Sequence, residues 1–193
     1  MAIGSNKKTS SKPLSGLHLL MTYECNYECD HCFVWGGPSQ IGTMTPDTIE
    51  RILDEADALG TVEWIYFEGR EAFLYYEVMC DGIRMARDRG YSVGIVTNAY
   101  WATSDAEAMK WLEPLAGSVG DLSISSDAYH GSDEDAELVE TARQAAQRLG
   151  IPINTISVAE PGLTDAAGAA GQLPPGESAV LFRGRAAEKL ASR

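Results

Sequence analysis

The 193-residue sequence lacks the long apolar runs that mark membrane proteins and the leader that marks secreted proteins. No stretch approaches the roughly 18 consecutive apolar residues that are needed to span a bilayer. Residues 1–16 are polar, contain three lysines and have no apolar centre, so they do not resemble a signal peptide. The four cysteines, three of them clustered, do not form the framework of a secreted disulfide-rich protein. We therefore expect a cytoplasmic protein with reduced cysteines and no membrane partner.

Basic residues are also scarce, because 15 Lys and Arg stand against 28 Asp and Glu and give a formal charge of −13. A phosphate backbone would be repelled by such a chain, so we do not expect nucleic acid as its main partner. The length is sufficient for one domain with a sizeable core.

Apolar, β-rich stretches alternate with amphipathic helical patterns along the chain. Strands are expected over these five stretches: Leu17–Tyr23, Thr61–Phe67, Tyr91–Asn98, Asp121–Ser126 and Ile151–Val158. Helices are expected from Thr45 (N-cap) to Gly60 (stop), over about 74–89, from a Ser104–Glu107 capping box toward Leu115, and from Ser132 (N-cap) to Gly150. A further strand or helix is expected within Ala179–Leu190.

This alternation predicts an α/β fold built from βα units around a parallel sheet. A complete eight-unit barrel takes about 250 residues. The sequence therefore predicts a partial, open (β/α) barrel of about five to six units. Its last strand would present an open edge, which invites pairing.

Three cysteines, Cys25, Cys29 and Cys32, directly follow the first predicted strand, with three and then two residues between them. Thiolates are soft ligands that suit iron–sulfur clusters or zinc. Three protein ligands leave one coordination position open for a reactant. We favour an iron–sulfur cluster with an open iron. The alternatives are a zinc site completed by His31 or by a remote group, and three reduced cysteines without a metal.

Polar groups also follow the other predicted strands. They are Glu68-Gly-Arg-Glu71, Thr97-Asn98, Ser125-Ser-Asp127 and Glu160. The loops at the carboxyl ends of parallel strands converge, so we expect these groups to form one site for a charged ligand with many hydrogen-bonding groups. Taken singly, each could equally be a polar loop residue or a helix cap.

The spacing Cys-x3-Cys-x2-Cys, with an aromatic-type residue (here His31) before the last cysteine, resembles the signature of the radical S-adenosylmethionine (SAM) family. Phe67–Leu74 is similar to the Gly-Gly-Glu-Pro segment of that family, with Gly69 and Glu71 matching. Arg70 replaces the second glycine and Ala72 the proline.

Two later segments extend the likeness, which covers about Leu17 to Val158. Thr97-Asn98-Ala99 resembles the Thr-Asn-Gly of the family, and Ser125–His130 resembles its fourth-strand segment, which reaches the ribose and methionine portions of SAM.

The resemblance implies a 4Fe-4S cluster held by Cys25, Cys29 and Cys32. It implies a SAM site that includes the following residues: His31, Gly69, Arg70, Glu71, Asn98, Ser125 and Asp127. The implied activity is reductive cleavage of SAM to a 5′-deoxyadenosyl radical, which abstracts hydrogen from an unidentified substrate, with a peptide or protein preferred. The electron donor would be a protein such as flavodoxin or ferredoxin. No catalytic residue is assigned.

We expect residues 1–15 to form a disordered leader, 16–160 the radical SAM-like partial barrel, and 161–193 a Gly/Ala/Pro-rich loop with a C-terminal segment. Arg70 and Ala72 leave a second hypothesis open, a non-catalytic iron–sulfur or zinc-binding interaction module with a degenerate SAM site. A third is a fragment of a longer enzyme.

His130 is expected to be an exposed loop histidine, with a proton carrier near pH 7 as the alternative. Cys80 is expected to pack as a small apolar residue in the second predicted helix, with a hydrogen-atom donor as the alternative. The sequence holds no second cysteine cluster, so no auxiliary iron–sulfur site is predicted.

Overall fold

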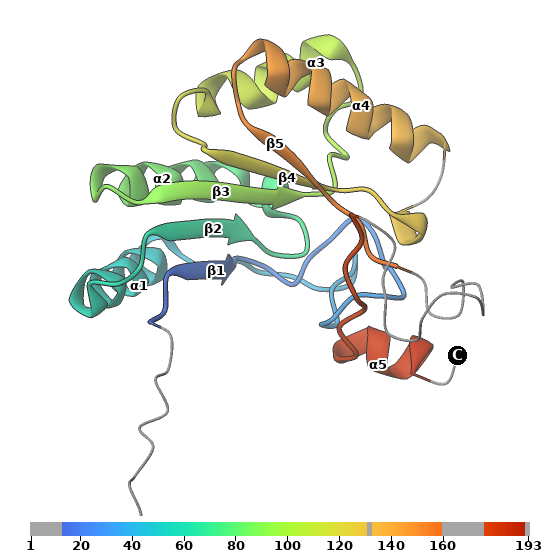
Figure 1. Cartoon of the computed structure of the whole chain (residues 1–193), viewed down its shortest axis with the longest axis horizontal. Coiled ribbons are helices and arrows are strands. Elements are labelled where there is room, and N and C mark those ends of the chain that lie inside the picture. Colours follow the sequence, from blue (N-terminus) through green and yellow to red (C-terminus); the bar gives the residue numbers. More distant parts are fainter. Residues whose placement is uncertain (1–12, 131–132, 160–175, 192–193) are drawn as a thin grey trace, which may run out of the picture.

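The computed structural model describes residues 13–130, 133–159 and 176–191 (Figure 1). Ser132 and Glu160, the predicted helix cap and strand-end group, lie outside the described residues. The strands are β1 (Gly16–Leu20), β2 (Trp64–Glu68), β3 (Ser92–Thr97), β4 (Asp121–Ser125) and β5 (Ile153–Ile156). The helices are α1 (Pro46–Leu59), α2 (Tyr76–Asp88), α3 (Asp105–Leu112), α4 (Asp133–Arg148) and α5 (Gly184–Leu190). Short 3₁₀ turns cover Ala72–Tyr75, Glu113–Leu115 and Ala128–His130.

The five strands form one sheet in the order β1-β2-β3-β4-β5, and every neighbouring pair is parallel. Each step from one strand to the next passes through a helix, which is the arrangement that the alternating sequence pattern predicts. The predicted α/β fold, a partial and open barrel, is confirmed. The observed strands are shorter than the predicted ones. The strands β1, β3, β4 and β5 end before their predicted carboxyl ends, whereas β2 begins three residues later than predicted and ends at Glu68.

The edge of β5 is met by a short stretch of the C-terminal segment. Ser178 forms a parallel bridge with Val158, in which its N–H donates to Ser157 O at 2.8 Å and its carbonyl accepts from Ala159 N at 3.0 Å. The following residues then form α5, so the element expected within Ala179–Leu190 is a helix.

The ends of α1 follow the predicted capping chemistry. The Thr45 hydroxyl accepts a hydrogen bond from Thr48 N at 3.2 Å, and Pro46 occupies the first turn. Gly60 ends the helix with a φ of 65°, a conformation that favours glycine. In α3 the Ser104 hydroxyl accepts from Glu107 N, while the Glu107 carboxylate pairs with Lys110, so only one half of the predicted capping box forms.

The hydrophobic core lies between the sheet and its covering helices. In Figure 1, α1 and α2 lie along the β1–β3 side, and α3 packs beside α4 on the β4–β5 side. Fully buried side chains come from both layers: Leu53, Ile65, Phe67, Met79, Ile95, Leu112, Leu122 and Ile124. Cys80 is half-buried against this core, as predicted for a small apolar residue. The middle of each strand is therefore mainly apolar, and the polar groups lie at the strand ends.

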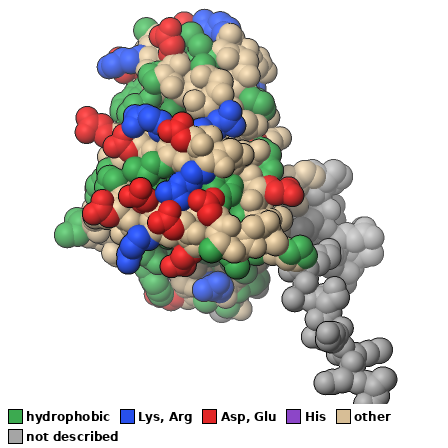
Figure 2. Space-filling view, turned by 90° about the vertical axis from the view of Figure 1, so that its left-hand side faces the viewer, with side chains coloured by type: hydrophobic (Ala, Val, Ile, Leu, Met, Phe, Trp, Pro, Cys, Tyr) green, Lys and Arg blue, Asp and Glu red, His purple; other side chains and the backbone are tan. Residues whose placement is uncertain are grey.

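Charged side chains of both signs are interspersed on the face where the strands begin, which Figure 2 shows. Its Lys and Arg side chains are separated by acidic and apolar ones rather than gathered into a basic patch. Among the described residues, no helix combines the length and the apolar character required to cross a membrane.

Candidate cofactor site

Backbone hydrogen bonds between the segments that follow β1 and β2 continue beyond the ends of both strands. The cysteine-bearing loop, residues 25–36, begins just after these bonds. Arg70 N donates to Thr22 O at 3.1 Å, and Glu71 N donates to Glu24 O at 3.2 Å. A side chain at Gly69 would place its Cβ 3.0 Å from the backbone of Thr22, so this close approach favours glycine.

The loop closes on itself at its base. Gly37 N donates to Tyr23 O at 3.2 Å, and Cys25 N donates to Gly37 O at 3.3 Å. The excursion from Cys25 to Gly36, which we call the cysteine loop, is therefore fixed at both ends beside the carboxyl end of β2.

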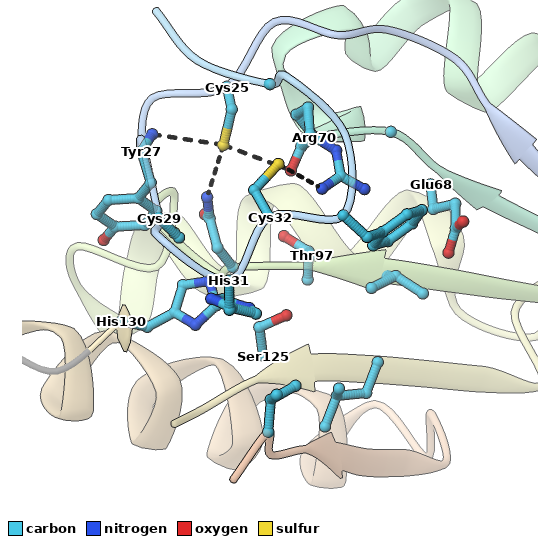
Figure 3. Close-up of a pocket in the computed structure, with 17 residues that line it drawn as sticks. Cys25, Tyr27, Cys29, His31, Cys32, Glu68, Arg70, Thr97, Ser125 and His130 are labelled. Atoms are coloured by element: carbon cyan, nitrogen blue, oxygen red, sulfur yellow. Dashed lines mark hydrogen bonds between the residues drawn. The ribbon is translucent and has the colours of Figure 1, made fainter. Parts of the chain in front are cut away.

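The cysteine loop and the ends of β2, β3, β4 and β5 surround a pocket of about 190 Å³ (Figure 3). Eight of the predicted site residues line it: Cys25, Cys29, His31, Cys32, Gly69, Arg70, Asn98 and Ser125. The remaining lining residues include Tyr27, Phe33, Gly36, Glu68, Val96, Thr97, His130, Ile156 and Val158. All three loop cysteines are free thiols, with Cys25 and Cys32 buried and Cys29 partly exposed.

Cys25 is held by nitrogen donors from its own loop and from the end of β3. Tyr27 N donates to its sulfur at 3.4 Å, and the Asn98 side-chain amide approaches the same sulfur at 3.8 Å. That amide also donates to the Asn26 side chain at 2.8 Å. Burial is the main cause that raises the pKa of the Cys25 thiol to about 12. A metal that replaces the thiol proton would remove this cost of ionising a buried group.

Ala99, which follows Asn98, adopts a φ of 62° and is the one non-glycine residue with positive φ in the described part of the chain. This left-handed conformation favours glycine. Ala99 therefore adopts a backbone conformation that glycine would adopt at lower cost.

Arg70 extends into the pocket and contacts the other side of the cysteine loop. Its Nη1 donates to Cys32 Sγ at 3.1 Å, and its guanidinium carbon lies 4.6 Å from the centre of the Phe33 ring. Its side chain runs directly over Gly36, where a Cβ would lie 1.9 Å from two of its methylene carbons. Arg70 Nε is buried and has no hydrogen-bond partner. The guanidinium therefore has one N–H donor that is not used in the described structure.

Glu71, predicted to bind the cofactor, lies behind the pocket wall and does not line it. Its fully buried carboxylate accepts hydrogen bonds from Thr97 Oγ1 at 2.9 Å, Asn98 N at 2.8 Å and Phe73 N at 3.1 Å. Burial outweighs these bonds and raises the pKa of Glu71 to about 7. In the structure Glu71 thus ties the end of β2 to the end of β3.

Asp127 is also placed behind the wall. Its side chain is 1% exposed and accepts from His130 Nδ1 at 2.9 Å, from Tyr129 N at 3.0 Å and from Val158 N at 3.3 Å. Burial alone would raise the pKa of Asp127, but the hydrogen bond and charge of His130, with His31 and Tyr129 N, lower it overall.

Two histidines lie beside Asp127 and the cysteine loop. His130 lines the pocket with a side chain only 12% exposed, so the expectation of an exposed loop histidine is wrong. Burial alone would lower the pKa of His130, but hydrogen bonds to Asp127 and Cys29 raise it to about 10. A histidine with that pKa stays protonated near pH 7. His31 stacks on Tyr129 at 4.4 Å, and burial lowers its pKa to about 4.

Three soft thiolates on one loop are a donor set that fits an iron–sulfur cluster. Zinc–sulfur bonds of about 2.3 Å would hold thiolates roughly 3.8 Å apart. The three loop cysteines are not among the groups of described residues whose ligand atoms all lie within 4.8 Å of one another. His31, Asp127 and His130 do form such a group, and the 2.9 Å hydrogen bond between Asp127 and His130 accounts for much of its closeness. N–H groups directed at cysteine sulfurs are also among the features that tune iron–sulfur clusters.

Sequence reasoning missed several residues that shape the site. Tyr27 and Phe33 lie within the cysteine segment, so their proximity to the pocket could have been predicted from their sequence positions alone. Arg185, on α5, donates to Cys29 O at 3.1 Å, and no motif connects it with the loop.

Comparison with known proteins gives a family match over most of the chain. The model of the radical SAM superfamily matches residues 19–168. Bacillus subtilis YydG, named for peptide biosynthesis, is 26% identical over 107 residues, which is 55% of this chain and 34% of YydG. The tungsten-containing aldehyde ferredoxin oxidoreductase cofactor-modifying protein of Pyrococcus furiosus is 32% identical over 89 residues, which is 46% of this chain and 25% of that protein. The chain thus spans about a quarter to a third of the length of these relatives.

A solved structure with a similar arrangement is Streptococcus suis SuiB bound to its precursor peptide SuiA. The TM-score is 0.48 at 15% sequence identity, with 75% of this chain and 40% of SuiB covered.

Proposed function

The chain belongs to the radical SAM superfamily, and from this we propose that Cys25, Cys29 and Cys32 hold a 4Fe-4S cluster at which SAM is cleaved. When bound, the cluster would supply one electron to SAM, giving methionine and a 5′-deoxyadenosyl radical that takes a hydrogen atom from the substrate. The observation that carries the proposal is the convergence of three free thiols on a pocket walled by four strand ends. Such a pocket lies where ligands bind in parallel α/β barrels.

The chain's own residues have three roles in this proposal. Tyr27 N, the Asn98 amide and the Arg70 guanidinium donate to cysteine sulfurs and orient them. Gly69 and Ser125 line the pocket and would contact SAM, while His31 would flank the cluster. Glu71 and Asp127 would act indirectly, because they hold the turns that carry these groups.

Apolar side chains of the pocket would protect the reaction from water. Val96, Ile156 and Val158 are among the residues that line it. Exclusion of water and orientation of the reactants are what a protein contributes when a cofactor carries the difficult chemical step.

We propose a peptide or protein as the substrate, a preference supported by the peptide-biosynthesis name of YydG. Reduced flavodoxin or ferredoxin is the proposed electron source. A reducing cytoplasm is the proposed location, because the cysteines must stay reduced to bind iron.

The test is electron paramagnetic resonance of anaerobically reconstituted, dithionite-reduced protein, with and without SAM. We expect a 4Fe-4S signal that changes when SAM is added, together with formation of 5′-deoxyadenosine. Cys29→Ala is expected to abolish cluster assembly. Cys80→Ala is the matched control, because that thiol packs against the core away from the pocket. Full iron content in Cys29→Ala would refute the assignment.

A second function is favoured by one observation, the position of Arg70. Its side chain takes up space in a pocket of about 190 Å³, which is smaller than the roughly 300–1,000 Å³ typical of small-molecule sites. On this alternative, the protein is a non-catalytic iron–sulfur or zinc-binding module with a degenerate SAM site. A cluster signal that is indifferent to SAM in the natural chain, but responds to it in Arg70→Gly, would support this alternative.

A further inference from the structure

Helix α5 lies beyond the residues that match the family, 19–168, yet it packs directly on the cysteine loop. Two of its backbone N–H groups reach loop carbonyls: Ala186 N donates to Cys32 O at 3.0 Å and Arg185 N to Val34 O at 3.3 Å. Gly184 makes this approach possible, since its φ is 56° and a Cβ there would lie 2.5 Å from the Val34 backbone.

The Arg185 side chain extends this contact to the rest of the loop. It is buried, with 6% of its surface exposed, although it carries a charge. Nη1 donates to Cys29 O at 3.1 Å, and Nη2 donates to Gly36 O and approaches Glu28 Oε1 at 3.3 Å. One guanidinium therefore joins the middle of the cysteine loop to its end, and α5 contributes the two further bonds described above.

Among these hydrogen-bond partners of Arg185, only Glu28 carries a negative charge, although Asp30 and Glu188 line the same hollow. Carbonyl oxygens solvate a cation but carry no net charge, and the Glu28 side chain is 66% exposed, so water weakens that ion pair. Burying a cation is costly unless opposite charge compensates for it. Thiolates in the same loop would add negative charge beside it.

We propose that Arg185 is a positioning residue of the metal centre, which shapes the cysteine loop through the carbonyls of Cys29 and Gly36 and offsets the negative charge of the bound cluster. The proposal rests on the proposed function, because it requires a cluster in the loop. It assigns to the C-terminal segment a role in holding the cofactor that the family-matched residues do not supply.

The experiment compares Arg185→Met and Arg185→Lys with matched changes at Arg183, an exposed neighbour. Each protein is reconstituted anaerobically, and iron release to a chelator is followed by absorbance. Loss of groups that orient metal ligands typically weakens metal retention about 10- to 100-fold. We expect Arg185→Met to lose iron at least about tenfold faster than Arg183→Met.

The reduction potential separates positioning from plain packing. Arg185→Met removes a cation near the cluster, so the midpoint reduction potential of the cluster should become more negative. For a one-electron couple, each tenfold change in the equilibrium constant corresponds to about 59 mV. Arg185→Lys keeps the charge but loses the planar fork that reaches two carbonyls, so it should release iron faster than Arg183→Lys while its midpoint stays near that of the natural chain.

The outcomes are distinguishable. If the natural chain takes up no cluster, the proposed function fails. If the natural chain holds a cluster and both Arg185 variants match their Arg183 controls in iron release and midpoint, the role of Arg185 is refuted. If Arg185→Met does not fold, as judged by circular dichroism, the comparison of Arg185→Lys with Arg183→Lys decides, and equal iron release would refute the proposal.

Discussion

Glu71 is expected to make the stability of the protein fall as the pH rises, and Glu71→Gln should remove that dependence. In the unfolded chain this carboxyl has a pKa near 4.5, and in the folded protein burial raises the pKa to about 7. Between these values the folded state holds a proton that the unfolded state has released, so the free energy of unfolding decreases with increasing pH. The contribution is fully present below pH 4.5 and is lost by the time the pH exceeds 7.

The size of the effect follows from the shift. At 1.36 kcal/mol for each pKa unit, a rise from 4.5 to about 7 corresponds to about 3 kcal/mol. Glutamine cannot ionise and keeps an oxygen that accepts from Phe73 N or Asn98 N. The side-chain NH2 group of glutamine would face one of the other hydrogen-bond donors. We therefore expect a less stable protein whose free energy of unfolding depends less on pH.

The measurement is urea unfolding of the metal-free, reduced protein at pH 5 and pH 8, followed by circular dichroism. All other titrating groups are shared by the two proteins, so the difference between their pH dependences isolates Glu71. The reasoning is refuted if both proteins change by the same amount, within about 1 kcal/mol.

Three further predictions concern single substitutions. Arg70→Gly restores the glycine of the family and empties part of the pocket. The cluster-loaded variant should therefore bind SAM about tenfold more tightly, as measured by equilibrium dialysis. An unchanged affinity would show that Arg70 does not obstruct SAM binding. Gly82→Ala would gain about 1 kcal/mol of helix propensity, but its Cβ would lie 2.4 Å from the Phe67 ring and 3.2 Å from Ile49. Because overpacking costs about 1–3 kcal/mol, we expect a net loss of stability, and a higher Tm would contradict it. Thr45→Ala removes the N-cap of α1 and should cost about 1 kcal/mol in urea unfolding, whereas Thr45→Ser should not.

The fold could be predicted from the sequence because its signals are local. The spacing of Ile49, Leu53 and Ala56 indicates one buried helix face, and Thr45 and Gly60 mark its ends. Polar residues after the first four apolar strands also predicted a shared site, and eight of the predicted site residues line the same pocket. These inferences need only periodicity and the geometry of parallel sheets.

The parts that could not be predicted depend on where a side chain turns after its strand ends. Glu71 and Asp127 follow strand ends like the pocket residues, but backbone donors draw their carboxylates behind the wall. His130 was expected to be exposed, and its hydrogen bond to Asp127 instead holds it within the site. A sequence pattern places a residue at the end of a strand, but it does not decide between the two faces of the following turn.

The contact between Arg185 and Cys29 is still harder to predict from the sequence, because 156 residues separate the two and no sequence pattern connects them over that distance. Its apolar neighbours Ala186 and Leu190 predict only that some helix face is buried. What that face covers is decided by the tertiary fold.

The distance along the chain between the cysteine loop and Arg185 has a consequence for biosynthesis. The cysteines leave the ribosome before α5, and the Arg185 side chain that donates to the Cys29 carbonyl follows 156 residues after Cys29. At roughly 5–20 residues per second, that separation corresponds to about 8–30 s of translation. During this interval the nascent thiols are exposed to oxidants and to competing metals without α5 over their loop. We therefore expect iron–sulfur delivery to act after α5 has been synthesised, and the reducing capacity of the cell to protect the thiols until α5 has docked.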